Sequence, residues 1–140
     1  MSDLWRQLST ANELGLKTLY ALDKAQVLGL ITSKAKNYKS LTKPEKIFLG
    51  NPNLMHVLCP VVDKGNERET FFFGQLKVNH DVTYPKSGDF LIDGKYLFEV
   101  GGKGKNFQQI ADLPDSYLAV DDTEIGHGNR IPLWLFGFMY

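Results

Sequence analysis

This chain of 140 residues lacks several features that would assign it to a common class of protein. It has one cysteine, Cys59, so an intramolecular disulfide is excluded, which favours a reducing compartment. It has no apolar run close to the roughly 20 residues that a membrane span requires. Its first residues have no apolar segment of the kind found in signal peptides. We therefore expect a cytoplasmic protein without a membrane segment.

The chain also has no excess of charge of either sign. Sixteen basic residues balance sixteen acidic ones, so an argument for nucleic-acid binding must come from local patches. Nine Phe, six Tyr and two Trp provide ample side-chain volume for a packed core. At this length we expect one domain, or one domain with a small appendage.

The first 45 residues are predicted to be mainly helical. Helices are expected over residues 3–14 and 16–28, separated at Gly15, with a short strand at residues 30–32. A helix, a turn containing Gly, a second helix and a strand are the ingredients of a winged helix-turn-helix. The simpler alternative is an ordinary helical hairpin, and the sequence leaves both interpretations open.

A basic stretch follows between Ser33 and Lys46, where one acid, Glu45, opposes five lysines. Four of these lysines are candidates for contact with a nucleic-acid phosphate backbone: Lys34, Lys36, Lys39 and Lys43. Because lysine is also a common residue of exposed surfaces, the alternative is a solvated loop. Nucleic acid is thus one candidate partner.

Residues 46–140 have a mixed pattern of strands and helices. A helix predicted from Asn66 to Asn79 places Glu69 on the same face as Phe72, Phe73 and Leu76. Shorter elements are expected as a strand at 46–49, a helix from about 51 to 58, strands at 82–84, 89–92, 96–100, 117–120 and 131–138, and a helix at 106–113. We therefore divide the chain into a helical segment, residues 1–45, and an α+β domain, residues 46–140.

Two acids and a lysine stand on neighbouring predicted strands. Asp89 begins one strand, Glu99 lies near the end of the next, and Lys103 follows just beyond. Paired carboxylates hold a hard divalent cation such as Mg²⁺ or Mn²⁺ that activates water, and an ammonium group stabilises charge on a phosphate. The pattern predicts a site for phosphodiester chemistry with Asp89 and Glu99 as metal ligands.

The two acids share one face of the sheet only if the turn between their strands has the right length. A two-residue turn at Asp93 and Gly94, the strongest local hairpin pattern, would send the acids to opposite faces. A three-residue loop over residues 93–95 would place Asp89 directly opposite Glu99. The local turn pattern favours the first register, whereas the metal site requires the second, and we expect the second.

The element order from residue 66, with Glu69, Asp89 and residues 99–103 at its motif positions, resembles the PD-(D/E)XK nuclease superfamily. Residues 19–31, 46–54, 68–72 and 88–103 are similar to the C-terminal domain that follows the ATPase module in a family of prokaryotic AAA-type ATPases. The resemblance implies a restriction-endonuclease-like fold, a mixed sheet flanked by helices. It also implies four catalytic residues, Glu69, Asp89, Glu99 and Lys103, and an ATPase module, another protein or nucleic acid as the partner.

The chain departs from that pattern in two respects. It has no phosphate-binding loop of an ATPase, because residues 101–105 have neither the spacing nor the Ser or Thr of that motif, so we expect a detached C-terminal domain. The superfamily has a lysine two residues after the second acid, where this chain has Gly101. Lys103 or Lys105 would have to reach back with its long, flexible stem. We therefore expect phosphodiesterase activity to be latent or lost, and a non-catalytic protein-interaction domain is the alternative.

Two of these features have simpler explanations. If Asn66 caps its helix, Glu69 occupies the acid position of a capping box. The glycines of residues 101–104 allow a tight turn with positive φ, and the lysines beside them keep the turn at the surface. The sequence does not decide between these roles and roles in the site.

Overall fold

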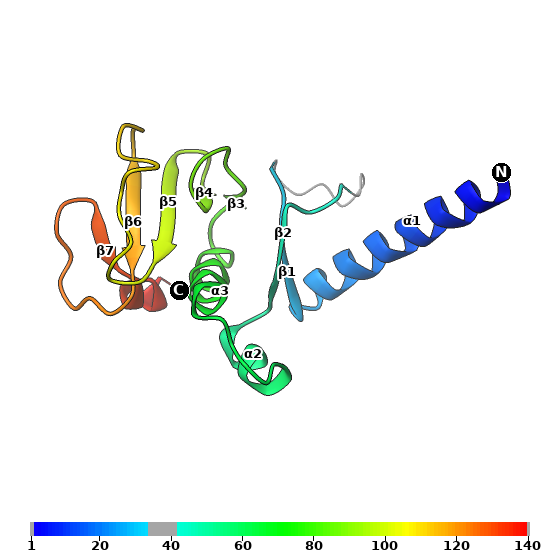
Figure 1. The fold of residues 1–140 in the computed structure, drawn as a ribbon, viewed down its shortest axis with the longest axis horizontal. Helices are drawn as coiled ribbons and strands as arrows, with labels where there is room; N and C mark the ends of the chain where they lie inside the picture. The colour runs from blue at the N-terminus through cyan, green and yellow to red at the C-terminus, as the bar shows by residue number, and fades with distance from the viewer. Residues whose placement is uncertain (1, 34–41, 140) are drawn as a thin grey trace.

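The computed structural model describes the backbone of residues 2–33 and 42–139 and the side chains of residues 13–33 and 42–139. Figure 1 shows the elements in chain order: α1 (Ser2–Lys24), β1 (Leu28–Ile31), β2 (Lys46–Leu49), α2 (Pro52–Leu58), α3 (Lys64–Leu76), β3 (Val82–Thr83), β4 (Phe90–Ile92), β5 (Tyr96–Gly101), β6 (Ser116–Val120), β7 (Arg130–Pro132) and the 3-10 helix η1 (Leu133–Phe138). None of the helices in the described part of the chain combines the length and the apolar character needed to cross a bilayer.

The strands form two sheets, so the fold is α+β, as the sequence predicted. β1 and β2 make an antiparallel pair, and the other strands form a mixed sheet in the order β3-β4-β5-β6-β7. β3, β4 and β5 are antiparallel neighbours, whereas β6 and β7 are added in parallel to β5. In Figure 1, α3 lies between the two sheets and contacts both β5 and β2, while α1 extends away from them.

α3 supplies the centre of the hydrophobic core. Phe72, Phe73 and Leu76 are buried on the face that the helical periodicity predicted. The Phe72 ring lies 5.0 Å from the ring of Phe90 and 5.1 Å from that of Phe98, which joins the helix to β4 and β5. Each fully buried phenylalanine contributes roughly 1.5–3 kcal/mol through area removed from water. These contacts fix the position of Glu69 on the same helix.

The start of α3 differs from the prediction. Asp63 is the N-cap, and its carboxylate accepts a hydrogen bond of 2.8 Å from the backbone N–H of Asn66. The prediction that Asn66 caps the helix is therefore wrong, because an acceptor three residues earlier already satisfies the free N–H groups of the first turn. Glu69 lies beyond that turn, so the capping-box explanation for Glu69 is wrong as well.

The N-terminal segment contains one continuous helix where two were predicted. α1 runs through Gly15 without interruption, because a single Gly costs only about 1 kcal/mol in a helix whose other residues favour it. The second helix of a helix-turn-helix is not present in the described residues 2–33, so that interpretation is wrong. β1 pairs with β2 across residue 45, where the sequence analysis placed a domain boundary.

Two predicted elements near the C-terminus also differ. Residues 106–113 form successive turns, with hydrogen bonds from Ile110 to Phe107 and from Leu113 to Ile110, and the predicted helix is wrong. So short a polar segment does not offset the cost of helix nucleation. The strand predicted over residues 131–138 ends at Pro132, which cannot donate to a sheet ladder, and the chain continues as η1.

Candidate functional site

β4 and β5 are joined in the register that the metal site requires. Phe90 pairs with Phe98 and Ile92 with Tyr96, so the loop has three residues and Asp89 comes directly opposite Glu99. The two-residue turn that the local pattern favours does not form, because contacts of Asp93 stabilise the longer loop. Asp93 has a positive φ of 53° in this loop. Its carboxylate accepts a hydrogen bond from the backbone N–H of Asp81 at 2.9 Å. It also lies 2.7 Å from the ring nitrogen Nδ1 of His80, and this partner holds the pKa of Asp93 below its ordinary value.

Asp89 is fixed beside Glu99 by two hydrogen bonds. The backbone N–H of Asp89 donates to the carbonyl of Phe98 at 2.8 Å. The carboxylate oxygen Oδ2 of Asp89 accepts from the backbone N–H of Val100 at 2.9 Å. Asp89 therefore bonds both neighbours of Glu99 in β5, which places the two acids at the same level of the strand pair.

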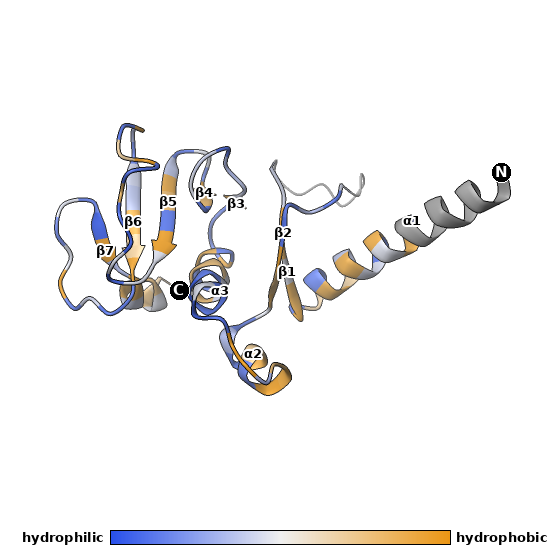
Figure 2. Ribbon diagram, viewed as in Figure 1, coloured by the Kyte–Doolittle hydropathy of each residue, from blue (hydrophilic) through white to orange (hydrophobic). Residues whose placement is uncertain are grey.

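Glu99 is buried in a way that is unusual for a carboxylate. It is 1% exposed, and its oxygen Oε2 has no hydrogen-bond partner among the described residues. Phe98 and Val100, on either side of it, belong to the core packed on α3, so alternation along the strand points Glu99 to the other face. Figure 2 shows the hydrophilic band that results in the otherwise hydrophobic β5. A buried polar atom left unpaired costs about 1–3 kcal/mol, and more if charged, so the acid is a poor structural element.

Lys46, the first residue of β2, enters the site from the two-stranded sheet. Its ammonium nitrogen lies 2.8 Å from Oε2 of Glu69 and 3.8 Å from Oδ1 of Asp89. It also lies 5.8 Å from the centre of the Tyr84 ring. Glu69 is thus connected to Asp89 through a lysine, and its predicted role in catalysis stays a prediction. From the sequence, Lys46 was recognised only as the last lysine of a basic run, because the acids that it contacts are distant in the chain.

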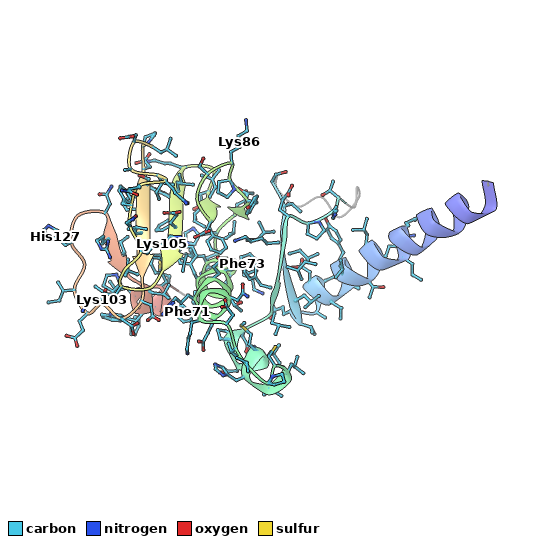
Figure 3. The ribbon with its side chains drawn as sticks, viewed as in Figure 1. Phe71, Phe73, Lys86, Lys103, Lys105 and His127 are labelled. Carbon is cyan, nitrogen blue, oxygen red and sulfur yellow. The ribbon has the colours of Figure 1, made fainter. Side chains whose placement is uncertain are left out.

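Lys105, rather than Lys103, reaches back to the acids. The Lys105 ammonium lies 3.6 Å from Oε1 of Glu99. Its stem lies over Gly101: a Cβ added to that glycine would stand only 2.7 Å from the Cβ of Lys105. Lys103 is exposed, and its backbone carbonyl accepts a hydrogen bond from Arg130 at 3.0 Å. Figure 3 labels both lysines, with Lys105 over the sheet strands and Lys103 farther toward the end where η1 lies. The choice of Lys103 as the lysine at the acids is therefore corrected to Lys105.

Together these residues form what we call the acid cluster, which contains three carboxylates and two ammonium groups: Glu69, Asp89, Glu99, Lys46 and Lys105. In the described part of the chain, no group of three or more His, Cys, Asp or Glu side chains is arranged to hold a metal ion. The cluster is thus no all-protein metal cage. Mg²⁺, however, is commonly held by one or two carboxylates together with water and substrate phosphates.

The atoms available for such an ion can be named. Oε2 of Glu99 has no hydrogen-bond partner among the described residues. Oδ1 of Asp89 has the long contact of 3.8 Å with Lys46, while Oδ2 is used by the backbone. Carboxylate oxygens are the ligands that hard cations such as Mg²⁺ and Mn²⁺ prefer. Each acid therefore has one oxygen of the kind that the metal implied by the family resemblance prefers.

The structure describes only one of the four lysines that were predicted to contact nucleic acid. Lys43 is exposed, just before β2. Lys34, Lys36 and Lys39 lie outside the described residues. The proposal that this stretch contacts phosphate remains a prediction.

A hollow of about 310 Å³ lies elsewhere on α3, and none of the acid-cluster residues lines it. It is lined by Pro52, Lys64, Glu67, Arg68, Phe71, Asp121, Leu133 and Trp134. Its charges pair with one another: Arg68 donates to Asp121 at 2.8 Å, and Lys64 lies 2.7 Å from Glu67. The hydrogen bond from Arg68 holds the pKa of Asp121 below its ordinary value. These side chains stabilise one another.

In comparisons with known proteins, no family model, no curated protein and no solved structure matches this chain. Any assignment of function must therefore come from the acid cluster itself, together with the sequence resemblance.

Proposed function

We propose that this chain is a nuclease-like domain that binds a divalent metal ion between Asp89 and Glu99 and recognises a phosphodiester there, with weak hydrolysis at most. The observation that carries the proposal is Glu99. It is 1% exposed, has one oxygen without a partner in the described part of the chain, and lies beside a second carboxylate held rigidly to the same strand. Buried polar atoms in proteins are almost always satisfied, and a cation is the partner that both acids suit.

The order of elements supports this proposal at the level of the fold. From α3 onward the chain forms a helix, three strands, a connection and a further strand, which resembles the order of the restriction-endonuclease-like core. The connection, residues 102–115, consists of turns in place of a helix. Ile110 within it is fully buried, so the connection packs against the rest of the domain.

Lys105 supports the proposal because it could stabilise negative charge on a phosphate. Its stem fills the space that a side chain at residue 101 would occupy, so its ammonium reaches Glu99 from the region where the superfamily has its lysine. A divalent cation at the two acids would polarise a phosphodiester and activate water. Lys105 would stand beside it and stabilise negative charge on the phosphate.

We expect weak hydrolysis because both lysines are engaged by the acids. Lys105 lies 3.6 Å from Glu99, and Lys46 lies 3.8 Å from Asp89. A cation stabilises a transition state only if it is oriented toward the charge that develops there. Nucleic acid as the source of the phosphodiester, and an AAA-type ATPase as the parent protein, are proposed from the sequence resemblance alone.

The test is a calorimetric titration of Mn²⁺ into the wild type and the double variant Asp89→Ala, Glu99→Ala. We expect weak binding by the wild type and none by the double variant. The matched control is Asp121→Ala, Asp122→Ala, which removes two acids outside the cluster and should leave binding unchanged. Plasmid incubated with Mg²⁺ should be cleaved slowly or not at all. Absence of metal binding by the folded wild type would refute the proposal.

A positional exchange tests the role of Lys105. Lys105→Ala alone should abolish any residual cleavage, whereas Gly101→Lys combined with Lys105→Ala restores the spacing of the superfamily and should raise cleavage above the wild-type level. The second substitution is needed because the stem of Lys105 occupies the space above residue 101. Cleavage that does not respond to either variant would contradict a role for this lysine.

A specific observation favours a second candidate, a protein-interaction domain. η1 and the residue after it leave apolar side chains exposed: Trp134 (52%), Leu135 (40%), Phe138 (67%) and Met139 (41%). Contiguous exposed apolar side chains often mark interaction surfaces. If the titration shows no metal binding and plasmid stays intact, this second candidate becomes the better one.

A further inference from the structure

Lys46 lies near two acids that come from different parts of the fold. It is contributed by β2, in a different sheet from Asp89, and its ammonium stands between Glu69 and Asp89. Its side chain is 28% exposed, against 19% for Glu69 and 18% for Asp89. The charge is thus largely withdrawn from solvent, so its effect on a neighbouring cation is only partly screened.

The contacts of Asp89 explain why this charge matters. Its oxygen Oδ2 accepts from the Val100 backbone, which leaves Oδ1 as the atom that faces a cation, and Oδ1 is the atom nearest Lys46. Glu99 lies opposite Asp89 in the strand pair, with Oε2 unpartnered among the described residues. Asp89 therefore has a lysine near its free oxygen and, across the strand pair, an acid with one unpaired oxygen.

We propose that Lys46 is an internal competitor of the metal ion, an ammonium that occupies Asp89 when no metal is bound and must be displaced when one enters. This inference rests on the proposed function, since it concerns the same pair of acids. Two like charges a few ångströms apart repel each other strongly where solvent is partly excluded.

The experiment compares Mn²⁺ affinity by calorimetry in four proteins: the wild type, Lys46→Met, Lys46→Arg and Lys43→Met. Lys46→Met removes the charge and keeps an apolar stem, and we expect its affinity to rise about tenfold. Lys46→Arg keeps the charge and should bind as the wild type does. Lys43→Met removes an exposed lysine just before the same strand and should have no effect. If Lys46→Met fails to fold, Lys46→Gln replaces it.

The outcomes separate this inference from the proposed function. If the wild type binds Mn²⁺ and Lys46→Met binds it with unchanged or weaker affinity, the competition is overturned and the metal site remains supported. A purely structural lysine would give this result, because its loss lowers stability without raising Mn²⁺ affinity. An equal rise in Lys43→Met would reveal a general effect of net charge, and would also overturn it. Absence of binding in the wild type and in both uncharged Lys46 variants would overturn the site and the competition together.

Discussion

Arg68 and Glu69 are adjacent in α3, yet their side chains enter two ionic clusters of opposite character. Arg68 donates to Asp121 at 2.8 Å and lies 3.7 Å from Asp122, at the rim of a hollow, with the two acids 43% and 72% exposed. Glu69 points to Lys46 and the acid cluster, whose most important member, Glu99, is 1% exposed. The acids of the first cluster are largely exposed to solvent, whereas the second contains a fully buried carboxylate with one oxygen that no described residue pairs.

The difference indicates that one cluster stabilises the fold and the other is suited to binding. The Arg68 cluster satisfies its own hydrogen bonds at little desolvation cost, so it supports the fold. The acid cluster has one short contact, 2.8 Å between Lys46 and Glu69, but its other contacts are 3.6 and 3.8 Å long and one oxygen of Glu99 is paired by no described residue. The core holds the acid cluster in place, but the contacts of the cluster contribute little to the stability of the fold. An arrangement that costs stability in this way is more typical of a binding site than of a structural element.

The largest expected effect comes from neutralising Glu99. Glu99→Gln keeps the shape and removes the charge, so Mn²⁺ affinity should fall at least about tenfold. The free energy of unfolding should stay unchanged or rise by up to about 1 kcal/mol, since a neutral amide is less costly to bury than a carboxylate with one oxygen that no described residue pairs. Calorimetry and urea unfolding measure the two quantities. A loss of more than about 2 kcal/mol in unfolding free energy would show that Glu99 stabilises the fold. The contrast drawn between the two clusters would then be wrong.

Arg68→Met should give the opposite result. Removing the guanidinium leaves Asp121 and Asp122 without their partner, so we expect the unfolding free energy to fall by about 1–2 kcal/mol. Mn²⁺ affinity should remain within about twofold of the wild type, because the side chain points away from the acid cluster. Lys86→Met, at an exposed lysine labelled in Figure 3, is the control for loss of a positive charge. A weaker metal site in Arg68→Met would show that the two clusters are coupled.

The smallest effect is a pH dependence. The hydrogen bond from Arg68 lowers the pKa of Asp121 from its ordinary value of 3.8, so the ionised form stabilises the folded state. That stability is fully present above the unfolded pKa and is lost as the pH falls through the lowered folded pKa. Because the carboxylate is partly exposed, Asp121→Asn should be less stable than the wild type by about 1 kcal/mol or less near neutral pH. Urea unfolding at a series of pH values should show the two proteins converging in acid. A difference that persists there would contradict an ionic origin.

Part of the site could be predicted because its elements are defined by short stretches of sequence. The face of α3 formed by Phe72, Phe73 and Leu76 follows from helical spacing, and it carries Glu69 to the sheet. The short helix α2 begins after Asn51, whose side chain accepts from the backbone of Leu54, as the local pattern indicated. The acids at 89 and 99 were visible as charges at the ends of two apolar strands. In each case neighbouring residues alone determine the outcome.

Where local alternatives compete, residues distant in the chain decide between them. The turn after β4 has the local pattern of a two-residue hairpin, yet the three-residue loop that we expected forms, because His80 and Asp81 bind Asp93. Gly101 alone suggested a missing lysine, yet Lys105 folds its stem over that position. The strand expected after Ile131 ends early because Pro132 cannot donate and Phe136 turns into the core.

The sequence by itself determined the α+β class, the main core helix and the two acids, because periodicity and residue chemistry are properties of single segments. Only the tertiary structure decided that Lys46 and Lys105 are the cations of the acid cluster and that Glu99 retains an oxygen without a partner in the described chain. Lys46 lies 43 positions before Asp89 by residue number, in a different sheet. Such a contact follows from how α3 packs between the two sheets, since burial and charge pairing depend on the assembled core and on no local pattern.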